Sequence, residues 1–94
     1  MYTATVEVFS DQSNAAVMRH PRRKYPGVLV QGDTLHSLYA AADACCKQLH
    51  DSLDDDTSAR MIDLRDHLRS LVNHYKAVLG EHKIPLPFSD TSNV

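Results

Sequence analysis

Residues 27–38 read GVLVQGDTLHSL, and within them the spacing of apolar side chains changes from that of a strand to that of a helix. Residues 27–31 are mostly apolar, which is typical of a buried strand. From Leu35 onward the apolar residues recur three or four positions apart, which places them on one face of a helix. Asp33 or Thr34 can accept hydrogen bonds from the free N–H groups at the helix start. This stretch therefore predicts a strand, a short junction and a helix.

Two further strands are predicted on the N-terminal side of this stretch. Residues 3–9 alternate between two faces with a period of two, which is the spacing of a strand. Residues 10–14 are a polar turn cluster, and residues 15–20 return as the second arm of a hairpin that ends before Pro21. Because residues 27–31 are the most apolar of the three segments, we expect them to be the central strand.

Two helices follow, over residues 33–56 and 57–80. The second helix carries one apolar face, made by Met61, Leu64, Leu68, Leu71, Tyr75 and Val78. This face is long beside so small a sheet, so part of it is expected to lie uncovered in a monomer. We therefore expect a homodimer.

The predicted fold class is α+β: a three-stranded antiparallel sheet followed by two long helices (β-β-β-α-α) and an extended C-terminal tail. Length predicts a single domain over residues 1–94, with the sheet in residues 1–32 and the tail in residues 81–94. The tail cannot be helical because Pro85 and Pro87 interrupt it. A composition of 43% hydrophobic and 23% charged residues excludes a disordered chain.

The strongest local feature is a basic segment over residues 19–25, RHPRRKY. Its cations could bind acidic groups on a protein partner or the phosphates of a nucleic acid, and the alternative is a solvated loop tip. The net charge of −2 does not by itself require a polyanionic partner. The candidate partner-binding residues are Arg19, Arg22, Arg23, Lys24 and Tyr25.

Cysteine usage and hydropathy bear on compartment. Cys45 and Cys46 are adjacent, so they are poorly placed to bond to each other, and they suit a reducing environment. The sequence has no apolar run long enough to cross a membrane, and its first twelve residues, MYTATVEVFSDQ, do not resemble a signal peptide. We therefore expect a cytoplasmic protein without membrane attachment.

Potential catalytic and metal-ligating residues are few. Asp43, Cys46 and His50 share one face of the first helix, and Asp63 and His67 are one turn apart on the second. No CxxC or HExxH motif and no phosphate-binding glycine loop accompanies them. A small enzyme or metal protein around Cys46 and His50 is the weakest hypothesis, and we expect no catalytic residues, metal or cofactor.

Residues 25–42, YPGVLVQGDTLHSLYAAA, resemble the antitoxins of the HicB type. The matching residues are Pro26, Gly27, Gln31, Gly32, Asp33, Thr34, Leu35 and Ala42. The chain is also similar to an uncharacterised group of small bacterial proteins with a PGVLVQGD run and a PLPF-like terminal segment. The resemblance implies a non-enzymatic module that binds a protein such as a toxin. The second helix stands where the HicB pattern usually has a further strand and a DNA-binding segment, and its charges are mixed.

Two functions follow as hypotheses. The first is an intracellular protein-interaction module, antitoxin-like or immunity-like, that binds and neutralises a toxin or effector protein. The alternative is a nucleic-acid-binding regulator that uses the basic segment 19–25.

Overall fold

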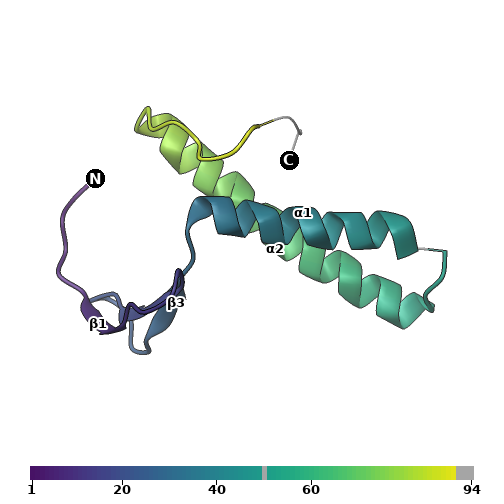
Figure 1. The fold of residues 1–94 in the computed structure, drawn as a ribbon, viewed down its shortest axis with the longest axis horizontal. Helices are drawn as coiled ribbons and strands as arrows, with labels where there is room; N and C mark the ends of the chain where they lie inside the picture. The colour runs from purple at the N-terminus through teal and green to yellow at the C-terminus, as the bar shows by residue number, and fades with distance from the viewer. Residues whose placement is uncertain (50, 91–94) are drawn as a thin grey trace. The chain divides into compact units, whose positions relative to one another are not determined.

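The computed structural model describes residues 1–49 and 51–90, and it confirms the α+β class (Figure 1). The chain divides into two compact units, Met1–Gln31 and Gly32–Val94, which are described separately. The first contains β1 (Glu7–Ser10), β2 (Ala16–Arg19) and β3 (Gly27–Leu29). The second contains α1 (Gly32–Leu49) and α2 (Asp55–Glu81).

The three strands form an antiparallel sheet in the order β1-β2-β3. The prediction that the third strand is central was therefore wrong, and β2 occupies that position. The reason is that each strand pairs with the next one along the chain, so the middle strand in sequence is also the middle strand in space. β2 is half-buried, whereas β1 and β3 are exposed. The apolar character of β3 is thus presented at an edge of the sheet.

The sheet's register places Arg19 opposite Glu7, and Met18 opposite Val8. On the other side of β2, Met18 faces Gly27. The register shifts between Val8 and Ser10, so an irregularity interrupts β1 near its end. Paired residues share a face of the sheet, so Val8 and Met18 lie on one face while Glu7 and Arg19 lie on the other.

α1 and α2 are antiparallel neighbours joined by a short connection (Figure 1). α1 ends at Leu49, well before the predicted residue 56, and α2 begins at Asp55. The break comes early because Asp54 is the N-cap of α2, and its Oδ1 accepts a hydrogen bond from the Thr57 N–H at 2.6 Å. Asp55 and Asp56 then occupy the first turn, where negative charge is favourable.

The buried core of the helical unit is small. Within the described residues, the buried hydrophobic side chains are Tyr39, Cys46 and Val72. Tyr39 and Cys46 are seven residues apart on α1, so both project from the same side of that helix. Gly32, at the start of α1, is also buried, and its Cα lies directly against the ring of Tyr75.

The segment after α2 returns to the helices through Phe88. Its ring stacks on His36 of α1, with ring centroids 4.1 Å apart and an interplanar angle of 12°. The Phe88 ring is also 6.4 Å from that of Tyr75 on α2. The Lys76 ammonium lies 2.6 Å from a carboxylate oxygen of Asp90. These contacts anchor the described part of the extended tail, and residues 91–94 lie outside the described residues.

Neither α1 nor α2 combines the length and the apolar character that crossing a bilayer demands, as far as residues 1–49 and 51–90 are concerned.

Candidate functional site

A groove of about 520 Å³ runs along β3 within the sheet unit. Apolar residues make one part of its lining: Val6, Met18, Val28 and Leu29. Polar and cationic side chains make the other part: His20, Arg23, Lys24 and Tyr25. Because β3 is an edge strand, the outer side of its backbone has no strand partner among residues 1–49 and 51–90. The groove therefore combines an apolar surface, neighbouring cations and an open strand edge.

The loop between β2 and β3 presents the cations through a turn at His20. The backbone N–H of Arg23 donates to the His20 carbonyl at 2.9 Å, and the N–H of Arg22 donates to His20 Nδ1 at 3.1 Å. Pro21 suits this turn because its ring fixes φ and it needs no backbone acceptor. The turn brings the chain back toward β2, so that Arg23 and Lys24 reach the groove beside Met18.

The five predicted partner-binding residues divide into two sets. Arg23, Lys24 and Tyr25 line the groove. Arg19 belongs to β2 instead, and its guanidinium is paired across the sheet with the Glu7 carboxylate. The Arg22 guanidinium lies 5.3 Å from the centre of the Tyr2 ring, a cation–π contact. Only part of the basic segment is therefore presented to the groove.

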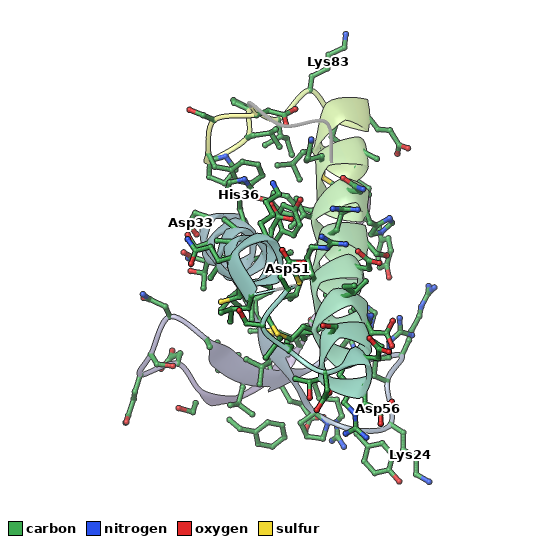
Figure 2. The ribbon with its side chains drawn as sticks, turned by 90° about the vertical axis from the view of Figure 1, so that its right-hand side faces the viewer. Lys24, Asp33, His36, Asp51, Asp56 and Lys83 are labelled. Atoms are coloured by element: carbon green, nitrogen blue, oxygen red, sulfur yellow. The ribbon has the colours of Figure 1, made fainter. Side chains whose placement is uncertain are left out.

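Lys24 and Tyr25 also contact each other. The Lys24 ammonium is 5.4 Å from the centre of the Tyr25 ring, and Figure 2 shows the lysine extending away from the ribbon. Both side chains belong to exposed residues. Such a pair offers a ligand a positive charge and an amphipathic ring side by side.

The sequence did not identify the apolar part of the groove. Val28 and Leu29 were assigned to a buried central strand, yet they are 59% and 53% exposed. Val6 and Met18 come from separate segments and meet in the groove only through the strand pairing. The one signal in the sequence that bears on these residues is the period of two in residues 3–9, which groups Val6 with Val8.

A second hollow, of about 470 Å³, lies between the two helices of the other unit. All of its lining residues are uncharged, and they are Leu38, Ala41, Ala42, Cys45, Met61, Leu64 and Leu68. The position of this hollow follows from the turn of 100° per residue in a helix, which puts Leu38, Ala42 and Cys45 to one side of Tyr39 and Cys46.

Charged residues gather on the other side of the helix pair. Asp43 lies 2.7 Å from the Lys47 ammonium and 3.5 Å from the Arg65 guanidinium. The hydrogen bond from Lys47 holds the pKa of the Asp43 carboxyl below its ordinary value, and the positive charges of Lys47 and Arg65 act in the same direction. Arg65 also donates to Asp66 at 3.0 Å, and Asp66 in turn lies 3.7 Å from Arg69. This side of the helix pair is an ion-pair network.

The structure describes only part of the suggested metal or catalytic group, namely Asp43 and Cys46. Asp43 is engaged by Lys47 and Arg65, Cys46 is buried, and His50 lies outside the described residues. In the part of the chain that the structure describes, no three His, Cys, Asp or Glu side chains are grouped so that they could hold a metal ion.

Comparison with known proteins gives one family. Residues 1–88 match the model of a family described as "Family of unknown function (DUF6959)". No curated protein and no solved structure matches the chain. The match spans all three strands, both helices and the tail as far as Phe88. The chain therefore belongs to the DUF6959 family of unknown function.

Proposed function

We propose that this protein is a non-enzymatic interaction module whose sheet unit binds an extended, acidic segment of a partner protein along β3. The observation that carries the proposal is the groove itself, with exposed Val28 and Leu29 on an open edge strand and Arg23 and Lys24 beside them. An extended peptide can add to such an edge through main-chain hydrogen bonds, while its alternate side chains enter neighbouring pockets. The two cations select acidic side chains at one end of that peptide.

The apolar lining favours a protein partner over the alternative, a nucleic acid. Val6, Met18 and Leu29 offer nothing to a phosphate backbone. Fewer cations are also available to bind phosphates than the sequence indicates, because the Arg19 guanidinium is paired with the Glu7 carboxylate. A nucleic-acid surface needs several cations that track successive phosphates, with aromatic rings on which bases stack.

The partner class and the compartment complete the proposal. The resemblance of residues 25–42 to HicB-type antitoxins supports a toxin or effector as the partner, neutralised by occupation of one of its acidic segments. Two free thiols, one of them exposed at Cys45, support a reducing compartment, and we place the protein in the cytoplasm.

The test is peptide selection with the full chain. A displayed library of random short peptides is panned on the purified protein, and enriched peptides are measured by fluorescence anisotropy. Peptides that alternate apolar residues and carry Asp or Glu at one end are expected. Amide shifts in the NMR spectrum of the protein are expected to map to residues 23–29. Enrichment of basic peptides, or shifts confined to the helical unit, would contradict the proposal.

Matched charge reversals sharpen the test. Lys24→Glu is expected to weaken binding of an enriched peptide at least tenfold, whereas Lys83→Glu, the same change in the other unit, leaves it unchanged. Leu29→Asn is expected to weaken binding as well, because Leu29 belongs to the apolar lining of the groove. A purely electrostatic interaction with the peptide would not be weakened by this substitution. If duplex or single-stranded DNA binds instead, with an affinity that falls steeply with salt and depends on Lys24, the nucleic-acid alternative holds.

A further inference from the structure

The helical unit has one side that is apolar and open. The hollow of about 470 Å³ between the helices is lined on α1 by the small residues Ala41, Ala42 and Cys45. Larger side chains border it, and two of them project strongly: Leu64 is 58% exposed and Leu38 is 50% exposed. We call this surface the apolar flank. A monomer would leave these leucines in water at a cost of about 25 cal/mol per Å² of apolar surface.

The opposite side of the helix pair has its charges matched already. Asp43 bridges Lys47 and Arg65, and Asp66 contacts both Arg65 and Arg69. Burying that network against a partner would require desolvation of its charges, which is costly. The apolar flank carries no such penalty, because none of its lining residues is charged. Association of the helical unit is therefore favoured on the apolar flank.

The size of the core gives an independent reason for association. The helical unit buries three hydrophobic side chains, Tyr39, Cys46 and Val72, among the described residues. Domains of below about 70–80 residues rarely obtain enough stability from a single small core, and oligomerisation is one of the common remedies. Another layer of helices against the apolar flank would supply the missing burial.

The shape and charge of the flank point to a second copy of this chain as that layer. A two-fold interface uses the same surface on both subunits, so this surface must supply both the hollows and the side chains that fill them. The apolar flank has both, with small residues at Ala41 and Ala42 beside projecting leucines at Leu38 and Leu64. Two identical charged surfaces would repel each other, and this lining has no charge to repel.

We propose that the apolar flank is the interface of a homodimer, in which two α1–α2 hairpins pack as a four-helix bundle around Leu38, Cys45 and Leu64. The proposal concerns the helical unit alone, so it stands or falls separately from peptide binding by the sheet unit.

Sedimentation equilibrium of the full chain tests the proposal with two matched variants. The wild-type protein is expected at twice its monomer mass of 10.5 kDa. Leu64→Glu, at a position exposed in the monomer, is expected to weaken the dimer at least a hundredfold. Ile62→Glu serves as the control, because Ile62 is also exposed, at 39%, but is not part of the apolar flank. It lines a different hollow, with Cys46, Lys47 and Arg65. Circular dichroism verifies that both variants remain helical.

Thiol accessibility provides a second readout that needs no substitution in the apolar flank, and circular dichroism verifies that its Cys46→Ala background remains helical. Cys45 is exposed in the monomer and lines the apolar flank, whereas Cys46 is buried. In a Cys46→Ala background, Cys45 is expected to react with Ellman's reagent more slowly as the protein concentration rises. A wild-type protein that stays monomeric, a dimer that Leu64→Glu and Ile62→Glu affect equally, or a Cys45 rate independent of concentration would overturn the proposal.

Discussion

The ring of Tyr75 occupies the space that a Cβ atom on Gly32 would need. Gly32 is the first residue of α1, and Tyr75 lies in the last third of α2, so the two helices approach closely at this point. The ring cannot retreat freely, because Phe88 lies beside it on the segment that follows α2. Gly32, the residue at which the helical unit begins, must therefore be glycine because of its contact with Tyr75, which is distant in the sequence.

Gly32→Ala is expected to destabilise the helical unit by about 1–3 kcal/mol, since an added methyl group forces the Tyr75 ring or α1 to shift. The measurement is urea unfolding followed by circular dichroism. Gly80→Ala is the matched control, because a Cβ at that helical position meets nothing within 4 Å. That substitution is expected to stabilise the protein by about 0.5–1 kcal/mol through helix propensity. Equal effects at the two positions would refute the steric explanation.

Asp54 is expected to make the stability of α2 depend on pH. The hydrogen bond that its carboxylate accepts from the Thr57 N–H lowers the pKa of Asp54 below its ordinary value of 3.8. Because the folded pKa lies below the unfolded one, the cap contributes its full stability well above the ordinary value of 3.8 and loses it as the pH falls through the folded pKa.

Thermal unfolding of two Asp54 variants tests that prediction. Asp54→Ala is expected to lower Tm at neutral pH and to have a smaller effect at pH 2.5. Asp54→Ser keeps a side-chain oxygen for the Thr57 N–H without a titrating charge, so it is expected to retain most of the stability and lose part of the pH dependence. A Tm difference between wild type and Asp54→Ala that stays constant with pH would count against the cap as its source.

The ion pair between Asp43 and Arg65 is expected to couple α1 to α2. Their side chains are 17% and 19% exposed, so water screens the pair less than it screens a surface pair. A double-mutant cycle with Asp43→Asn and Arg65→Met is expected to give a coupling energy of about 1 kcal/mol. The pair of Asp43 with Lys47, whose side chain is 73% exposed, is expected to give less than half of that. A coupling energy near zero for Asp43 and Arg65 would assign the helix contact to apolar packing alone.

Phe88 is expected to hold the C-terminal segment against the helices. Phe88→Ala removes the stack on His36 and the contact with Tyr75, so the segment around residues 85–90 becomes accessible to protease. Limited proteolysis is expected to cleave this variant there several times faster than wild type, with the helical circular dichroism unchanged. Ile84→Ala is the control, since Ile84 is half exposed. Cleavage at equal rates in both variants would assign the anchoring to Lys76 and Asp90 instead.

The sequence predicted those features that depend on near neighbours. The strand-to-helix change after residue 31 is a local pattern, and the two helices follow it with shifted ends. The end of α1 was placed at residue 56 rather than Leu49 because periodicity continues through Leu53, whereas the side chain of Asp54 decides where the next helix begins.

Features that depend on distant parts of the chain were not predictable. The sequence places Gly32 at the junction between strand and helix, but the reason why this residue must be glycine is the ring of Tyr75. Nothing in the sequence near residue 32 indicates that contact. The apolar run in β3 was interpreted as a buried centre, because hydrophobicity alone does not distinguish a central strand from an edge with a groove beside it. The basic segment was found, but not the pairing that commits Arg19 to Glu7.

The open edge of β3 also affects how the protein behaves at high concentration. An unpaired strand edge with exposed Val28 and Leu29 can template the same strand of another molecule, which is how edge-to-edge aggregation and fibrils begin. Natural sheets protect such edges with lysine and proline, and here Pro26 directly precedes the strand and Lys24 lies in the loop before it. The same short segment thus has to bind a ligand without associating with the same segment of another molecule. Any substitution of Lys24 or Pro26 therefore affects colloidal stability as well as ligand recognition.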